Sequence, residues 1–228
     1  PTLIISFALL GIFPLVARRV LEWLRRRRIY RDWERPRRFD RNLVVIGAGA
    51  AGLVSSYIAA TVNARVTLVE RHRMGGDCLN TGCVPSKALI RTARLLQDIR
   101  CARDYGVETA QADFDFGSAM ERVQRVIAQI APHDSRERYE VLGVEVLEGD
   151  ARLVSPWSVE VTGADGRTRT LTTRSIVLAT GAEPFVPPIP GLQEAGFLTS
   201  DTVWDLRECP RRLVVLGGGP IGCELSQT

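Results

Sequence analysis

Apolar and polar positions along residues 42–70 follow a strand–helix–strand order. A short apolar run, Leu43–Ile46, leads into a glycine-rich turn, a helix of small residues, and a second apolar run that ends at Glu70. Short continuous apolar runs bounded by turn residues are typical of strands buried in a parallel sheet. The pattern therefore predicts a βαβ unit whose two strands lie inside a sheet.

Two helical patterns and a set of strand patterns follow this unit. Residues 85–103 and 116–140 are predicted to be long helices. The second carries four apolar residues at helical spacing, Met120, Val123, Ile127 and Ile130. Strand patterns follow at residues 144–154, 157–163 and 168–180. Together they predict an α/β fold, with a Rossmann-like parallel sheet, crossover helices and a β-meander.

The turn after the first strand has the spacing G-x-G-x-x-G. It consists of Gly47, Gly49, Ala50 and Gly52, and Glu70 follows 18 positions after the last glycine. Glycine permits the tight turn, leaves room for a pyrophosphate, and lets helix and strand approach closely. The helix N-terminus offers unpaired N–H groups to the anion, and the glutamate can accept hydrogen bonds from ribose hydroxyls. This predicts a dinucleotide site.

A second copy of the same turn begins near the C-terminus. Residues 213–216 are predicted to be a strand, followed by Gly217, Gly219 and Gly222, with Glu224 on the next helix. Two such turns predict two dinucleotides. The position that would distinguish NAD from NADP follows the second strand of such a unit, which this sequence does not include.

Another small-residue turn lies between the two glycine turns. An apolar strand beginning at Ser175 ends in Ala179, Thr180 and Gly181. Small residues at the end of a strand allow the backbone to approach a flat cofactor closely. This turn is predicted to join the first nucleotide site.

The segment MGGDCLNTGCVPSKALI holds two cysteines, Cys78 and Cys83, and the only lysine of the chain, Lys87. The pair has four possible roles: a metal half-site, a structural disulfide, unrelated buried thiols or a redox pair. The other cysteines and histidines lack zinc-site spacing, and a disulfide over so short a loop would constrain little unfolded chain. A helix expected to start near Val84 or Pro85 would lower a thiol pKa at its N-terminus.

Charge distinguishes the N-terminal segment from the rest of the chain. Residues 18–41 hold eleven arginines and four acidic residues, a local net charge of +7, whereas the remaining residues sum to about −3. Residues 2–17 carry no charge, and Trp23, Tyr30 and Trp33 lie among the arginines. Residues 1–38 are interpreted as the end of a transmembrane helix and a basic juxtamembrane segment. The alternative is a helix that packs on the protein or a partner; nucleic-acid binding is not expected.

Four motifs in order, VVIGAGAAG, GGDCLNTGCVPSK, LATG and GGGPIG, resemble the class I flavin disulfide reductases, also called pyridine nucleotide-disulfide oxidoreductases. CVPSKALI is similar to the mercuric-reductase-like branch. The resemblance implies an FAD-binding domain at residues 39–208 and the start of an NAD(P) domain at residues 209–228. It also implies FAD contacts from further residues, Gly76, Asp77, Lys87 and Ala151. On this interpretation the chain is a fragment of a longer protein, inactive alone.

The resemblance also implies a relay in which NAD(P)H reduces FAD and the electrons then pass to a Cys78–Cys83 disulfide. Cys83 would lie nearest the flavin, Cys78 would attack a disulfide or metal-ion substrate, and Lys87 would stabilise the reduced flavin. The family's general acid, a histidine, would lie beyond Thr228, and the whole enzyme would be a homodimer. Asp77 departs from the usual threonine of the family, and no resident metal is expected.

The location expected from these features is the bacterial inner membrane, with the redox domain in the cytoplasm. The apolar N-terminus is similar to fusions in which a DedA-like membrane protein precedes such a reductase. Two other functions stay open: a quinone-reductase or transhydrogenase-like flavoenzyme that does not use the cysteines, and a non-catalytic membrane-tethered flavoprotein. His72 and His133 are not expected to be catalytic.

Overall fold

The computed structural model describes the backbone of residues 2–228 and the side chains of residues 13–228. The α-helices in this range are α1 (Thr2–Ile29), α2 (Ala50–Thr61), α3 (Gly76–Asn80), α4 (Cys83–Arg100), α5 (Phe116–Ile130), α6 (Arg136–Val141), α7 (Leu192–Ala195) and α8 (Pro220–Ser226). The strands are β1 (Arg41–Ile46), β2 (Val66–Glu70), β3 (Val144–Glu148), β4 (Asp150–Ser155), β5 (Ser158–Thr162) and β6 (Thr168–Leu178). Short 3₁₀ turns are η1 (Ala102–Tyr105), η2 (Ala131–Asp134) and η3 (Val203–Asp205).

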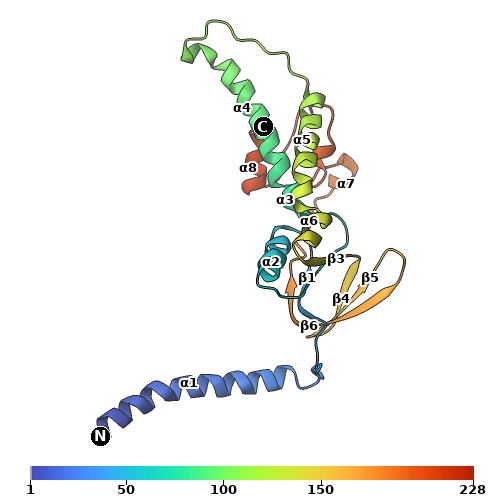
Figure 1. Cartoon of the computed structure of the whole chain (residues 1–228). Coiled ribbons are helices and arrows are strands. Elements are labelled where there is room, and N and C mark those ends of the chain that lie inside the picture. The colour runs from blue at the N-terminus through green and yellow to red at the C-terminus, as the bar shows by residue number, and fades with distance from the viewer. Residues whose placement is uncertain (1) are drawn as a thin grey trace.

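The strands form one sheet in the order β3-β2-β1-β6-β5-β4 (Figure 1). β3, β2, β1 and the second half of β6 are parallel, while β4, β5 and the first half of β6 form an antiparallel meander. Because β6 belongs to both parts, the sheet continues without a break from one to the other. The predicted α/β fold, with a parallel sheet, crossover helices and a β-meander, is confirmed.

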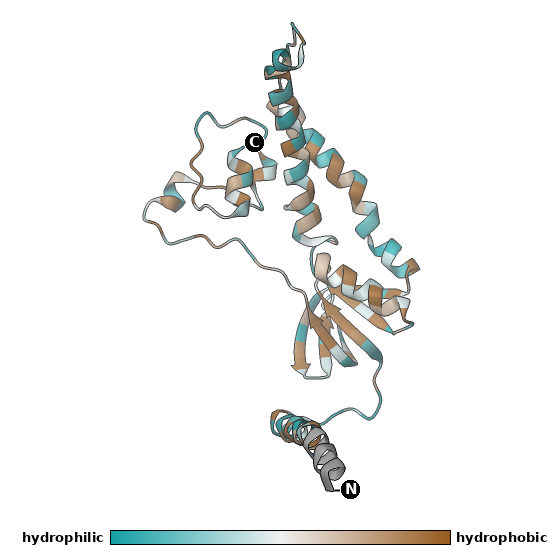
Figure 2. Cartoon of the chain, turned by 90° about the vertical axis from the view of Figure 1, so that its left-hand side faces the viewer, coloured by the Kyte–Doolittle hydropathy of each residue, from teal (hydrophilic) through white to brown (hydrophobic). Residues whose placement is uncertain are grey.

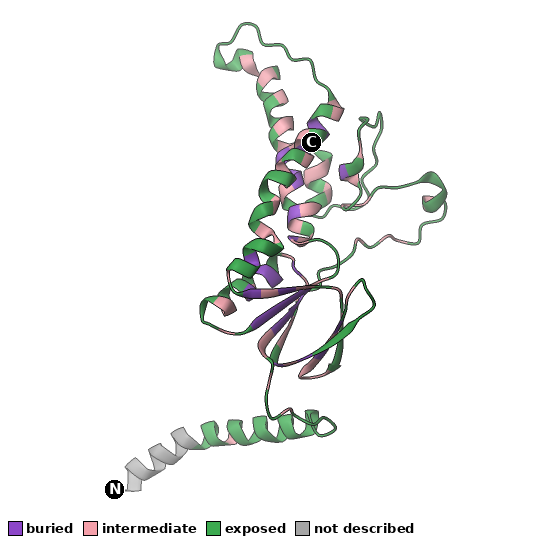
Figure 3. Ribbon diagram, turned by 45° about the vertical axis from the view of Figure 1, so that its right-hand side comes forward, coloured by how far each residue is buried: buried purple, intermediate pink, exposed green. Residues whose placement is uncertain are grey.

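Apolar residues of the central strands form the core of the sheet (Figures 2 and 3). On one face, Val45, Leu68 and Val146 pack with Leu53 of α2 and Tyr139 of α6. On the other face, β1 and β2 contribute to a cluster with three residues of the meander, Val159, Val161 and Leu171. The sheet therefore has a buried apolar layer on both faces, as its continuous apolar runs predict.

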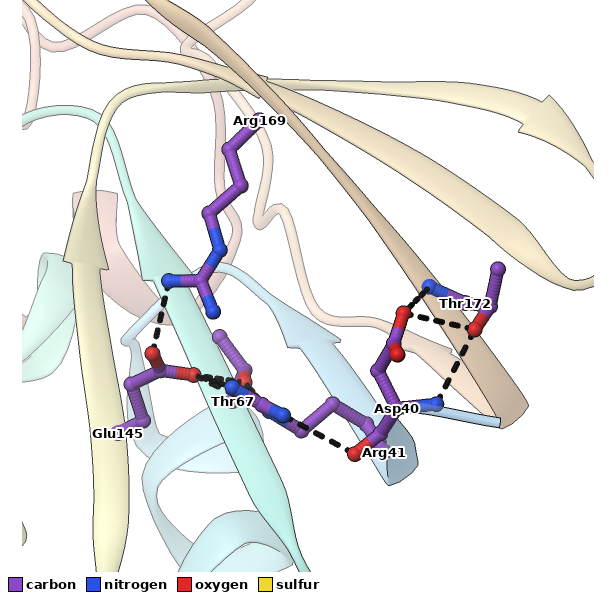
Figure 4. A network of polar contacts seen from close by, with 6 residues as sticks. All are labelled: Asp40, Arg41, Thr67, Glu145, Arg169 and Thr172. Atoms are coloured by element: carbon purple, nitrogen blue, oxygen red, sulfur yellow. Dashed lines mark hydrogen bonds and ion pairs between the residues drawn. The ribbon is translucent and has the colours of Figure 1, made fainter. Parts of the chain in front are cut away.

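A polar network ties four strands together at the amino ends of β1 and β2 (Figure 4). The Arg41 Nε donates to Glu145 at 3.1 Å and to the buried Thr67 hydroxyl at 2.7 Å, and Thr67 donates to Glu145 at 2.7 Å. Arg169 of β6 adds a further bond to the same carboxylate at 2.8 Å. Partial burial acts to raise the pKa of Glu145, but the bonds from Thr67, Arg41 and Arg169 outweigh it and lower the pKa to about 2.

Two elements that were predicted to be continuous are each divided into two in the structure. The helix predicted at 116–140 ends at Ile130, because Pro132 cannot donate a backbone bond, and α6 restarts after the side chain of Ser135 caps it. The strand predicted at 144–154 divides at Gly149, whose φ of +156° turns the chain away from β3.

The strand predicted at residues 213–216 does not form. The four apolar residues there are exposed and have no sheet partner among residues 2–228. A strand is held by its ladder with a neighbour, so apolar character alone does not produce one. The helix predicted after this turn is present as α8.

Helix α1 projects away from the sheet (Figure 1). From residue 13 to its end its side chains are exposed, apart from a half-buried Ala17. The prediction of a transmembrane helix rests partly on residues 2–12, whose side chains lie outside the described part. Across the described residues, none of the helices combines the length and the apolarity that a membrane span needs.

Candidate functional site

The first glycine turn lies at the carboxyl end of β1 and leads into α2. Gly47 has a φ of +100°, and a Cβ there would lie 2.2 Å from the carbonyl oxygen of Ala179. A Cβ at Gly52 would lie 1.8 Å from the carbonyl oxygen of Gly47. Side chains at these two positions would force the strand, the helix and the Ala179 turn apart. Glycine is therefore required by close backbone packing, as the spacing predicted.

Glu70 is held beside this turn at the end of β2. Its carboxylate accepts one bond from the backbone N–H of Ala48 at 2.6 Å and another from that of His72 at 2.8 Å. These bonds fix the side chain next to the glycine turn, and carboxylate lone pairs remain for further donors. A bond to a ribose hydroxyl stays a prediction.

A cavity of about 1040 Å³ opens at these carboxyl ends, large enough for an extended cofactor. The predicted residues that line it are Gly47, Gly49, Ala50, Glu70, Gly76, Asp77, Cys78, Ala151, Ala179, Thr180 and Gly181. The predicted residues outside its lining are Gly52, Cys83, Lys87, Gly217, Gly219, Gly222 and Glu224. The structure thus unites the first glycine turn, the Ala179 turn and the first cysteine in one cavity.

Sequence reasoning missed several residues that line the cavity. They include Arg71, His72, Arg73, Asn80, Thr81, Gly149, Asp150, Ala182, Glu183 and Asp201. Arg71 to Arg73 follow Glu70 directly, so their position after the second strand was a usable signal. The sequence around Gly149 and Asp150 gave no such signal, because only the pairing of β3 with β2 brings these residues to the carboxyl edge of the sheet.

The cysteine segment folds as the short helix α3 and the start of the longer helix α4, separated by a tight turn. Cys78 lies within α3, and Cys83 is the first residue of α4. The Asn80 side chain donates to the carbonyls of Met74 at 3.1 Å and Gly76 at 2.8 Å. A Cβ at Gly82 would lie 2.8 Å from the carbonyl oxygen of Asp77. These constraints fix the conformation of the loop that joins the two cysteines.

The thiols of Cys78 and Cys83 are close enough to interact. A hydrogen bond to Cys83, followed by desolvation, raises the pKa of Cys78. The expectation that a helix N-terminus lowers the thiol pKa is therefore wrong for Cys78, which lies inside α3 rather than at the start of α4. Cys83 is exposed and occupies the first position of α4.

Trp204 anchors a distant segment to the cysteine loop. Its indole N–H donates to the carbonyl of Thr81 at 2.8 Å and to that of Ser200 at 2.7 Å. The ring is 4% exposed and packs with Ala88, Met120 and Val123. Thr81 lies between the two cysteines, so this buried indole supports the loop directly.

Lys87 does not line the cavity but pairs with Glu224 across 137 residues. The Lys87 Nζ lies 2.6 Å from the Glu224 carboxylate, and both side chains are partly exposed. The pair joins α4 to α8, the helix of the second glycine turn. The two residues predicted to contact different cofactors are therefore in contact with each other.

Asp77 faces the small-residue turn after β6. Its carboxylate lies 3.6 Å from the position a Cβ would take at Gly181. No side-chain hydrogen bond to this carboxylate occurs among the described residues. Asp77 therefore adds an acceptor to the cavity.

Comparison with known proteins gives a consistent result. The family model "Pyridine nucleotide-disulphide oxidoreductase" matches residues 41–228. Among curated proteins, a mercuric reductase of Lysinibacillus sphaericus is 33% identical over 186 residues, which cover 82% of this chain and 33% of that protein. A dihydrolipoyl dehydrogenase of Chlamydia pneumoniae is 37% identical over 188 residues, which cover 80% of this chain and 39% of that protein.

A solved structure agrees with the fold. The Cu(II) complex of the HOCl-induced flavoprotein disulfide reductase RclA from Escherichia coli, a cysteine-to-serine mutant, aligns with a TM-score of 0.69 at 28% identity. The alignment covers 83% of this chain and 40% of that chain. The described chain thus spans well under half the length of these relatives.

Proposed function

This chain belongs to the pyridine nucleotide-disulphide oxidoreductase family, and on that basis we propose that it forms the FAD-binding part of an enzyme with a redox-active cysteine pair. Electrons from NAD(P)H would reach Cys78 and Cys83 and then a small disulfide or a metal ion. The observation that carries the proposal is that the first glycine turn, the Ala179 turn and Cys78 share one cavity.

The family uses FAD and NAD(P)H, and the residues of the cavity fit the first of these. Gly47 and Gly49 leave the backbone open beside the start of α2, whose unpaired N–H groups suit a pyrophosphate. Glu70, already oriented by two backbone bonds, would hold the ribose. FAD, when bound, supplies two-electron redox chemistry at this cavity.

The cysteine pair has the asymmetry that a dithiol relay requires. Two electrons and two protons break a disulfide and leave two thiols. The contact with Cys83 and partial burial raise the pKa of Cys78 and keep the proton there, while Cys83 lies at the N-terminus of α4. Because a thiolate rather than a thiol attacks a disulfide or a metal ion, Cys78 needs a base to remove its proton before it exchanges with substrate; its place in the cavity lining is what supports that role.

The proposal is tested by Cys83→Ser in the full-length flavoprotein. Anaerobic reduction by two electrons should give a long-wavelength charge-transfer absorbance in the wild type and none in the variant. Cys209→Ser is the matched control, because Cys209 is exposed like Cys83 but is not among the groups that act on Cys78. A band that survives in Cys83→Ser would contradict the assignment.

A reductive titration tests whether the cysteines take part at all. The wild type should take up four electrons, two in the cysteine pair and two in the flavin. Uptake of only two would instead support a quinone-reductase or transhydrogenase-like flavoenzyme that does not use the cysteines.

We propose the substrate class and assembly from the relatives. The matched proteins include mercuric reductases, dihydrolipoyl dehydrogenases and a glutathione reductase, so small disulfides and metal ions are the substrates to assay. The whole enzyme is proposed to be a homodimer, which sedimentation of the full-length protein would measure.

We also propose attachment to the bacterial inner membrane through α1, with the redox part on the cytoplasmic side. The support is the order of the sequence, in which an uncharged run precedes arginines and exposed aromatic residues. Extraction separates the alternatives: a protein released from membranes by salt alone would contradict insertion of the apolar run.

A further inference from the structure

Four consecutive arginines, Arg25 to Arg28, form a ring of charge around the last turn of α1. Successive residues of a helix point about 100° apart, so four of them cover almost the full circumference. The same four residues span only about 4.5 Å along the helix axis. We refer to these residues as the arginine ring.

The arginine ring is not neutralised by the rest of the described protein. All four residues are exposed. The ion pairs on this segment involve other arginines, namely Arg18 with Glu22 and Arg31 with Asp32. Within the ring, Arg27 lies over the Trp23 ring at 5.2 Å from its centre, a contact that keeps its charge. The ring therefore presents uncompensated positive charge in every direction around the helix.

This arrangement suits a helix whose axis crosses a surface rather than one that lies flat on it. A helix that lies flat on a surface needs its charges on one side and its apolar residues on the other. Here the order along the axis is apolar and then charged: Phe13, Leu15 and Val16 are exposed before the first charged residues, Arg18 and Arg19, and Tyr30 and Trp33 follow the ring. A layer of negative charge over an apolar layer complements that order.

Aromatic contacts fix the end of α1 to the sheet. The Tyr30 ring lies 4.9 Å from the Trp157 ring in the β4–β5 turn. The Arg35 guanidinium lies 5.6 Å from the Phe39 ring and 5.9 Å from the Trp157 ring. The segment enters β1 at its amino end, whereas the cavity lies at the carboxyl end, about 20 Å away. A surface bound by the ring would thus leave the cavity uncovered.

We propose that the arginine ring binds the phosphate groups of an anionic lipid surface. Helix α1 enters this surface with its end, and the ring lies in the headgroup layer. The inference deepens the proposed membrane attachment and adds the lipid class. It does not depend on the redox chemistry, so the two can fail separately.

Vesicle flotation of the full-length protein in its FAD-bound form tests the proposal. One set of vesicles is phosphatidylcholine alone and the other contains about 40% phosphatidylglycerol, each at about 0.1 M and about 0.5 M salt. The variant R25Q/R26Q/R27Q/R28Q removes the ring. The control R91Q/R94Q/R100Q/R103Q removes four exposed arginines from α4 and η1, away from α1.

The wild type should prefer anionic vesicles, and high salt should reduce that preference. The ring variant should bind them at least about tenfold more weakly, while the control variant should match the wild type. Equal binding of the wild type to both vesicle types would contradict lipid-phosphate binding by the arginine ring but would still agree with attachment through the apolar part of α1. Binding to neither would contradict both. Loss of binding in the control variant, or tighter binding to a short DNA duplex than to anionic vesicles, would also overturn the proposal.

Discussion

Glu145→Gln is expected to destabilise the protein near neutral pH and to have much less effect in acid. The substitution removes the charge that Arg41, Arg169 and Thr67 share at the amino ends of the strands (Figure 4). The folded-state pKa of this carboxyl is about 2, against an ordinary value of 4.5. A lowered pKa in the folded state means that the carboxylate stabilises the fold above about pH 4.5 and loses that contribution as the pH falls toward 2.

The magnitude follows from the difference between the two pKa values. Each pKa unit corresponds to about 1.36 kcal/mol, so the interaction contributes at most about 3.4 kcal/mol. The Glu145 side chain is 35% exposed, and water screens part of the interaction. We therefore expect Glu145→Gln to lower the free energy of unfolding at pH 7 by about 1–2 kcal/mol.

Urea denaturation followed by tryptophan fluorescence, at pH values from about 7 down to about 3, measures this loss. The difference between wild type and variant should fall to less than about half of its neutral value at the acid end. Glu121→Gln is the control: Glu121 pairs with Arg125 on an exposed helix surface, and its loss should cost less than about 0.5 kcal/mol. A Glu145→Gln destabilisation of the same size at every pH would refute an electrostatic role.

Two further predictions concern the cavity and the cysteine loop. Gly76→Ala should weaken FAD binding at least about tenfold in a flavin fluorescence titration, because the new Cβ would lie 2.5 Å from the Cα of Gly49. Gly218→Ala is the control: a Cβ at Gly218 has open space around it, so this variant should bind FAD as the wild type does. Trp204→Phe removes the bond to the Thr81 carbonyl and should lower the free energy of unfolding by about 1–3 kcal/mol in urea denaturation, and an unchanged value would show that the indole bonds do not support the loop.

The first nucleotide turn could be predicted in detail because its constraints are local. Gly52 must approach the Gly47 carbonyl within the same βαβ unit, and the structure places these atoms as expected; the approach of Gly47 to Ala179, in contrast, depends on β6. The position of Glu70 at the end of the next strand follows from the same unit.

Contacts between segments that are distant in sequence could not be predicted from local patterns. Lys87 and Glu224 are 137 residues apart, and nothing near either residue indicates the other. Trp204 carries no local signal that its indole supports the cysteine loop. Only the packing of α4 against α8 and of η3 against α5 brings these side chains into contact.

The sequence by itself determined the fold class and the close packing of the first glycine turn, because glycine spacing and apolar periodicity act over a few residues. The tertiary structure decided which residues line the cavity, that Lys87 pairs with Glu224, and that Cys78 has a raised pKa. It also decided that residues 213–216 form no strand here, since a strand requires a neighbour to accept its backbone hydrogen bonds. Burial, charge pairing and strand pairing depend on residues far away in the chain, and these are the properties that local patterns do not contain.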